Sequence, residues 1–244
     1  MLAEISGIGW ITANGAGCAK DHESFAMTDG PLPVITPQLI FGGAYAPFRR
    51  MDEYSRLGFG AIAFALKDAC LDACTEKRNI GIIASTAYGC LSTDMDYFDT
   101  VMSERGVGAS PSLFSFTLPS IFLAEAAIRF GMTGTTFIIN ENISCGLTVL
   151  ELALESILRG EADKMLCGVC NHNCPTGFEE ICSVPPGALF LVVEAIPEKG
   201  SSYGKVGINS HGHIEFNKET VTDLRELVQR CLKRNSERAN GWNR

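Results

Sequence analysis

Residues 79–86 (NIGIIAST) form a continuous apolar run of the length of one β-strand, and this run constrains the fold more than any other feature. A run of this kind is typical of a strand that is buried on both faces of a parallel sheet. Because parallel strands are joined by crossover helices, helical patterns should alternate with such runs. Further strand-like runs occur at 4–12, 133–140, 163–169, 188–195 and 205–210. The chain is therefore predicted to be an α/β protein.

Helical patterns fill the stretches between these runs. The clearest covers residues 52–74, where Asp52 or Ser55 is suited to cap the amino end. Its apolar positions recur at helical spacing and are Leu57, Ala61, Phe64, Ala65 and Leu71. Other helices are expected at 93–104, 121–130 and 147–159. Helices between successive strands would cover both faces of a mixed, mostly parallel sheet.

The remaining segments are expected to be loops and a tail. Residues 28–50 and 110–120 contain many Gly or Pro residues and show little periodicity, so both are expected to be connecting loops. A charged amphipathic helix is expected at 218–234. We therefore expect one domain over residues 1–216 and a C-terminal helix with a polar tail over 217–244.

Composition narrows the classes of partner. The net charge of −8 gives no electrostatic footprint for nucleic acid, and no dense cluster of Lys or Arg indicates an anionic membrane surface. No apolar stretch of about twenty residues indicates a membrane span. The ten cysteines lie mostly in apolar runs, as buried free thiols do, which favours a reducing cytoplasm over a disulfide framework. A small molecule or another protein is the expected partner.

Five segments in a fixed order carry a resemblance to a known family. They are an opening strand with a glycine turn at 5–15, an Arg-Met-Asp helix at 49–69, a strand with a glycine-rich turn at 80–93, a proline-containing segment with a helix and an Arg-Phe-Gly turn at 110–134, and an Arg-Gly-Glu-Ala-Asp turn with a strand at 159–169. Together they resemble the β-ketoacyl-acyl-carrier-protein synthases and their chain-length-factor relatives. The resemblance implies the N-terminal α/β half of the thiolase-like fold, standing here without the second half.

The resemblance also implies where a nucleophile should lie. In the family a Cys sits at a helix N-terminus, where the helix dipole favours the thiolate that attacks an acyl thioester. Counting forward from Gly134 and backward from Gly160 leads to Ile143, which cannot be acylated. The nearest thiol is Cys145, but two positions rotate a helical side chain by about 200°. Cys145 is thus either a displaced nucleophile or a packed small residue.

The family also uses two histidines, which come from the second half. This chain has four histidines, His22, His172, His211 and His213. His211 and His213 lie close together near the end of the recognisable region and would mimic such a pair. The alternative is that both belong to a solvated loop. Without a base and oxyanion donors a Cys loses most of its catalytic power, so we expect the single chain not to be a condensing enzyme.

Two other patterns have a functional and a structural interpretation. The spacing of Cys167, Cys170 and Cys174, with Cys182 nearby, suits zinc or an iron–sulfur cluster, and it also suits buried and loop thiols. The aromatic residues Phe114, Phe116 and Phe122 either line an acyl pocket or belong to the core.

No cofactor is expected. The Gly7-x-Gly9 pair lacks the full glycine pattern of a dinucleotide site and its following acidic residue, which leaves acyl carrier protein or acyl-CoA as possible ligands.

The function that the resemblance implies is that of a chain-length-factor-like accessory subunit of fatty-acid or polyketide biosynthesis. By resemblance, residues 133–140 would supply the edge of a homodimer, or of a heterodimer with a ketosynthase, and acyl carrier protein is a possible further partner. One alternative is a minimal acyltransferase or thioesterase-like enzyme that uses Cys145. The other is a module that binds acyl groups or carrier protein.

Overall fold

The computed structural model describes residues 2–73, 76–103, 105–141, 146–178, 184–195 and 202–241. The strands are β1 (Leu2–Thr12), β2 (Gly15–Cys18), β3 (Ile80–Thr86), β4 (Thr136–Asn140), β5 (Lys164–Asn171), β6 (Gly187–Glu194), β7 (Gly204–Ile208), β8 (Ile214–Phe216) and β9 (Glu219–Thr220). The helices are α1 (Pro37–Phe41), α2 (Glu53–Asp68), α3 (Leu91–Ser103), α4 (Pro111–Phe114), α5 (Ile121–Phe130), α6 (Leu147–Leu158) and α7 (Leu224–Gly241), with short 3₁₀ turns at Ala19–Asp21 and Ala46–Arg49.

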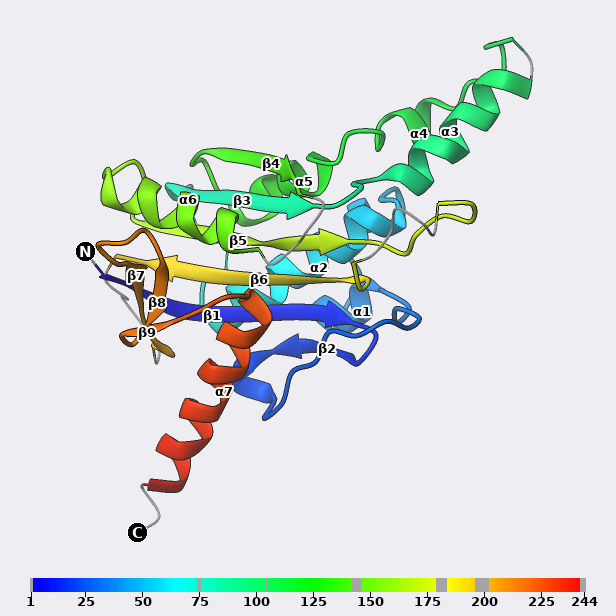
Figure 1. Ribbon diagram of the computed structural model, residues 1–244. Coiled ribbons are helices and arrows are strands. Elements are labelled where there is room, and N and C mark those ends of the chain that lie inside the picture. Colours follow the sequence, from blue (N-terminus) through cyan, green and yellow to red (C-terminus); the bar gives the residue numbers. More distant parts are fainter. Residues whose placement is uncertain are drawn as a thin grey trace.

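One sheet in the order β4-β3-β5-β6-β1-β7-β8-β9 organises the chain, and β2 pairs with β1 beside it. β3 runs parallel to β4 and β5, so their three arrows point the same way (Figure 1). β6 pairs antiparallel with β5 and with β1, and β7 is antiparallel to β1. The expected α/β class with a mixed sheet is confirmed, and the parallel pairing is concentrated in the β4-β3-β5 part.

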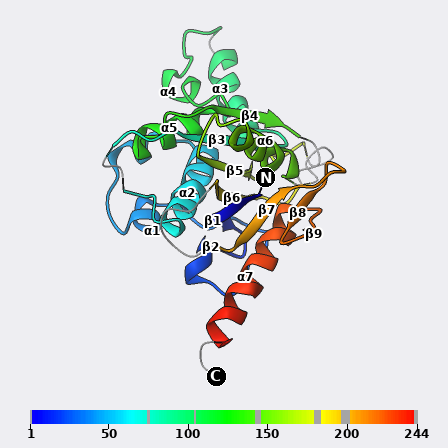
Figure 2. The same cartoon turned by 90° about the vertical axis from the view of Figure 1, so that its left-hand side faces the viewer.

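Helices cover both faces of the sheet, as expected. α1, α2 and α5 lie on one side, and α6 and α7 lie on the other (Figure 2). Every residue of β3, β5 and β6 is buried, as the continuous apolar runs predicted. Successive side chains of a strand point to opposite faces, so the apolar residues divide into two core clusters, one under each layer of helices.

The packing of α2 on β1 depends on a close backbone approach. Asp52 caps α2 by accepting a hydrogen bond from the backbone N–H of Ser55 at 3.0 Å. On β1, a Cβ atom at Gly9 would lie 2.1 Å from the backbone nitrogen of Ala65 and 2.6 Å from the backbone oxygen of Ala61. Glycine is therefore required there because the helix backbone occupies the space of a side chain.

Two regions extend away from this body. α3 and α4 project beyond the β4 end of the sheet, and the far end of α7 projects at the opposite side (Figure 1). The predicted amphipathic tail helix exists, but it begins at Leu224 rather than at 218, because residues 219–220 form β9. Within the described part of the chain, no helix has the length and apolar character needed to cross a bilayer.

Candidate functional site

The three parallel strands end side by side, and polar residues gather where they end. β3 ends at Thr86, β4 at Asn140 and β5 at Asn171. The side-chain oxygen Oδ1 of Asn171 accepts a hydrogen bond from the backbone N–H of Ala87 at 2.8 Å, which ties β5 to the turn after β3. The carboxyl ends of parallel strands are the usual place for ligands in open α/β sheets. The region at the carboxyl ends of β3, β4 and β5 is therefore the candidate functional site.

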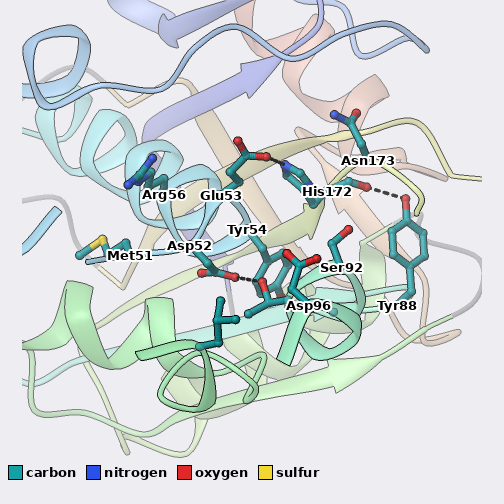
Figure 3. Close-up of a pocket in the computed structure, with 13 residues that line it drawn as sticks. Met51, Asp52, Glu53, Tyr54, Arg56, Tyr88, Ser92, Asp96, His172 and Asn173 are labelled. Atoms are coloured by element: carbon teal, nitrogen blue, oxygen red, sulfur yellow. Dashed lines mark hydrogen bonds and ion pairs between the residues drawn. The ribbon is translucent and has the colours of Figure 1, made fainter. Parts of the chain in front are cut away.

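A cavity of about 370 Å³ opens at this edge, between the start of α2, the start of α3 and the end of β5. Its lining includes three carboxylates, of Asp52, Glu53 and Asp96, and one cation, Arg56. The other polar side chains in the lining include those of Tyr88, Ser92, Thr93, His172 and Asn173, and Figure 3 shows how the labelled residues lie around the opening. The carboxylates outnumber the cations among these residues, so the cavity attracts neutral or cationic groups.

His172 is a titratable group in the wall of this cavity. Its Nε2 atom lies 3.5 Å from Oε2 of Glu53. Burial lowers the pKa of His172, and the nearby carboxylates of Glu53 and Asp52 act in the opposite direction. The backbone oxygen of His172 accepts a hydrogen bond from the Tyr88 hydroxyl at 2.7 Å, and burial raises the pKa of Tyr88 to about 12. A neutral imidazole of this kind accepts or donates one hydrogen bond in the cavity.

Asp52 joins the two helices that border the cavity. One carboxylate oxygen caps α2, and the other accepts a hydrogen bond from the Thr93 hydroxyl of α3 at 2.5 Å (Figure 3). The Asp52 carboxylate is therefore occupied by structural contacts, whereas Asp96 is exposed to solvent. The side chains around the cavity are therefore suited to binding a ligand through hydrogen bonds.

The nucleophile position lies outside the described residues, since neither Ile143 nor Cys145 is among them. Its described neighbours are at the same edge as the cavity. The backbone N–H of Glu141 donates to the Thr86 oxygen at 2.9 Å, and Gly146 lies against Val169 near the end of β5. The identity of the nucleophile, if the chain has one, stays a prediction.

His211 and His213 are exposed in the turn between β7 and β8. β7 is antiparallel to β1 and its end pairs with the first residues of β1, with Gly207 opposite Leu2. The turn that holds the two histidines is therefore at the opposite end of the strands from Glu141 and Gly146. The two histidines therefore lie in a solvated turn, away from the carboxyl ends of the parallel strands.

The cysteine cluster is not arranged as a metal site. Cys167 and Cys170 are fully buried in β5, on opposite faces of the sheet, so they cannot bind one ion. Cys174 is disulfide-bonded, which differs from the expectation of free thiols, and Cys182 lies outside the described residues. The described residues hold no group of three potential metal ligands.

The three phenylalanines do not line one acyl pocket. Phe114 is exposed on α4, whereas Phe116 and Phe122 are buried. Phe122 packs edge-on against Tyr54 at 5.4 Å between ring centroids and against Phe190 at 6.2 Å, in the core beneath α2. Phe116 lines a separate cavity of about 340 Å³ beside the Arg50–Glu125 ion pair.

Sequence reasoning missed the pairing of His172 with Glu53. A signal was present, since His172 directly follows a buried strand at the end where α/β sheets bind ligands. Glu53 follows the capping Asp52, but its proximity to His172 depends on how α2 packs on the sheet.

Comparison with known proteins decides the family. Residues 36–184 match the model of the β-ketoacyl synthase N-terminal domain. The chain belongs to the β-ketoacyl synthase family. It is 30% identical over 125 residues to the tetracenomycin polyketide synthase ketoacyl synthase alpha subunit of Streptomyces glaucescens, a match that covers 48% of this chain and 29% of that protein. A putative polyketide β-ketoacyl synthase 1 of Streptomyces virginiae is 27% identical over 129 residues, with 49% and 30% covered.

Solved structures of ketosynthases share the fold, which confirms the thiolase-like expectation. The ishigamide ketosynthase/chain length factor gives a TM-score of 0.66 at 17% identity, covering 84% of this chain and 62% of that one. A complex of the ketosynthase ApeO with its chain length factor ApeC from Xenorhabdus doucetiae gives 0.59 at 14% identity, covering 81% of each chain. Equal coverage means that the matched chain of that complex is about as long as this one. By contrast, the matches to the curated relatives span about 30% of their length.

Proposed function

We propose that the chain is a non-condensing, chain-length-factor-like subunit that pairs with a ketosynthase in polyketide or fatty-acid biosynthesis. The family assignment supports the pathway class. The sequence supports the non-condensing role, because an aliphatic residue, Ile143, occupies the position at which the family places its Cys. The heterodimer is favoured over the homodimer because neighbours in fold include a ketosynthase in complex with its chain length factor.

The observation that carries the proposal is the open edge at β4. Among the residues that the structure describes, this strand ends the sheet and pairs with β3 on its inner side alone. Its sequence TFIIN has no charged residue and no Pro, and none of its five residues is fully buried. Natural sheets normally protect such an edge with Lys, Pro or a covering segment, so an apolar, unprotected edge is suited to pairing with a second protein.

Apolar side chains on the neighbouring helices extend this surface. They are exposed on α3, α4, the turn that follows and α5, and they comprise Phe98, Met102, Phe114, Leu118 and Ile128. All of these elements lie at the β4 end of the sheet (Figure 1). Exposed apolar residues that gather at one end of a molecule are typical of a protein interface. We expect the pairing to take place in the cytoplasm, as proposed from the sequence, and acyl carrier protein to be a possible further partner.

A matched pair of substitutions tests the interface. The chain is co-expressed with the ketosynthase of its own genome, and the complex is measured by size-exclusion chromatography with light scattering. Thr136→Lys places a charge on the exposed position of β4, and Thr220→Lys makes the same change on β9 at the far edge of the sheet.

We expect a heterodimer for the unaltered chain and for Thr220→Lys. Thr136→Lys should raise the Kd roughly tenfold or more, because pairing would bury an unpaired charge. An unaltered chain that elutes alone beside the ketosynthase, or equal binding by both lysine variants, would contradict the proposal.

A further inference from the structure

Arg129, at the carboxyl end of α5, is surrounded by aromatic rings. Its guanidinium carbon lies 5.3 Å from the ring centroid of Phe41, 5.5 Å from that of Tyr45 and 5.4 Å from that of Phe130. A cation over the face of an aromatic ring is attracted by the negative charge of that face. Three such contacts together hold the guanidinium group of Arg129 in one position.

The three rings are themselves fixed by the core beneath them. All three pack against Phe59 of α2, which is fully buried. Phe41 meets it edge-on with 6.0 Å between ring centroids, and Tyr45 and Phe130 stack on it at 5.8 and 5.9 Å. The helices α1, α2 and α5 lie on the same side of the sheet (Figure 2). A guanidinium held by rings that rest on a packed core loses little conformational freedom when it binds a ligand.

The hydrogen-bond donors of Arg129 are not used within the described part of the chain. Its guanidinium forms no hydrogen bond or ion pair with a described residue, and its Nε atom is buried without a partner there. Arg56 differs in this respect, because it also lies over a ring, that of Phe48, but donates to the backbone oxygens of Phe48 and Arg49. A guanidinium that is held in place with unused donors is suited to an acceptor from outside the chain.

A cavity of about 580 Å³ lies beside Arg129, between α1, the carboxyl half of α2 and the end of α5. The charged residues in its lining are two cations, Arg129 and Lys67, and one carboxylate, Asp72. The Nζ atom of Lys67 lies 3.5 Å from Oδ2 of Asp21, and both side chains are about half exposed. Such a surface ion pair is weak, so the charge of Lys67 is available to a ligand.

These groups match the chemistry of a phosphate. The planar fork of Arg129 fits two phosphate oxygens at once, and the ammonium of Lys67 adds a second, compact charge. The Glu125 carboxylate, one turn before Arg129, is already paired with Arg50 at 3.1 Å. The apolar part of the lining would contact an organic group attached to the phosphate, and it comprises Leu39, Ile40, Phe41, Ala63 and Phe130.

We propose that this cavity binds the phosphate group of a small phosphorylated molecule, with Arg129 as the bidentate donor and Lys67 as the second cation. The site goes beyond the proposed function, since it uses neither the β4 edge nor the cavity at the carboxyl ends of the parallel strands. It also lies in a chain whose net charge is −8, so the attraction of an anion depends on these local cations.

Isothermal titration calorimetry of the isolated 244-residue chain tests the site. The probes are inorganic phosphate and phenyl phosphate at constant ionic strength, with acetate as a carboxylate for comparison. Arg129→Lys keeps the charge and removes the planar fork, whereas Arg129→Gln removes both. Arg159→Gln is the matched control, because it makes the same change at an exposed arginine that is paired with Glu155 at the end of α6. Lys67→Gln alters a side chain that is 47% exposed, so it leaves the ring cluster intact.

We expect the unaltered chain and Arg159→Gln to bind both phosphates, and acetate more weakly. The affinity for phosphate should fall roughly tenfold or more in both Arg129 variants, because charge-assisted hydrogen bonds are lost, and by a smaller factor in Lys67→Gln. Circular dichroism checks that each variant is folded. If the Arg129 variants are not folded, Lys67→Gln decides by itself, and an unchanged affinity in it would overturn the proposal.

Three other results would also overturn the proposal. The first is the absence of phosphate binding by the unaltered chain, and the second is equal binding by Arg159→Gln and the folded Arg129 variants. The third concerns the class of ligand, and it is binding of acetate as tight as that of phosphate, or binding of inorganic phosphate without binding of phenyl phosphate. None of these measurements requires a ketosynthase, so this test and that of the β4 interface succeed or fail independently.

Discussion

The imidazole of His172 lies against the carboxylate of Glu53, with 3.5 Å between Nε2 and Oε2, where the end of β5 meets the start of α2. The two side chains differ in their surroundings, since that of His172 is 12% exposed and that of Glu53 is 78% exposed. Burial removes water from the imidazolium form, and an exposed carboxylate offsets this only in part. The net result is a histidine whose pKa lies below its usual value.

Glu53→Gln should lower the pKa of His172 further, because the substitution removes a charge that favours the imidazolium form. An NMR titration of the histidine side chains measures this directly. The resonances of His213, which is exposed in the β7–β8 turn, serve as the internal reference. A rise in the pKa of His172 would show that Glu53 does not act on it as the geometry requires.

The lowered pKa of His172 also affects the pH dependence of stability. The free energy of unfolding should fall as the pH drops below 6.5, the ordinary pKa of a histidine, because the unfolded chain then binds the proton more readily than the native protein.

Asp68 joins three segments through one buried carboxylate. It accepts hydrogen bonds from the backbone N–H of Ile8 at 2.8 Å, from that of Lys20 at 3.0 Å and from the Tyr203 hydroxyl at 2.8 Å. Asp68→Ala should lower the free energy of unfolding by roughly 2–4 kcal/mol, because it leaves buried donors without acceptors. Tyr203→Phe removes one bond and should cost about 1 kcal/mol. Urea denaturation measures both, and equal losses would contradict the shared role of the carboxylate.

The pH dependence of stability gives a second view of Asp68. Burial raises the pKa of this carboxyl above 3.8, so the native state holds the proton at a pH where the unfolded chain has released it. The contribution of Asp68 to stability should therefore fall as the pH rises through 3.8 towards the native pKa, and it should then level off. The difference in unfolding free energy between the unaltered chain and Asp68→Asn, measured across the acid range, checks the sign.

Gly9→Ala should prevent normal folding, or cost about 3 kcal/mol or more, because the new methyl group would overlap the backbone of α2 and not a movable side chain. Gly43→Ala is the matched control, since a Cβ atom there meets nothing within 4 Å. Its effect should stay within about 0.5 kcal/mol. Thermal unfolding followed by circular dichroism compares the two. A Gly9→Ala protein as stable as the control would mean that α2 does not approach β1 as closely as described.

Local patterns in the sequence predicted most of the larger elements. The apolar runs identified β3, β5 and β6, and of the two candidate caps of α2, Asp52 and Ser55, the structure shows Asp52 in that role. Two short helices were missed inside expected loops. Both begin with a capping hydroxyl followed by Pro, at Thr36-Pro37 for α1 and at Ser110-Pro111 for α4, so a local signal was present. α2 ends at Asp68 and not at residue 74, and Cys70 beyond it has a φ of +58° that no side-chain pattern announced.

The sequence by itself determined the α/β class, the family resemblance and the aliphatic residue at position 143, because strand runs, helix caps and motif spacing depend on neighbours along the chain. Only the tertiary structure decided that His172 meets Glu53, that Leu224 packs against Gly146, and that the histidines of the β7–β8 turn lie at the opposite end of the sheet from the carboxyl ends of the parallel strands. These relationships join residues far apart in sequence. They are set by which apolar faces bury one another and by the direction in which each strand enters the sheet, and no local pattern encodes either.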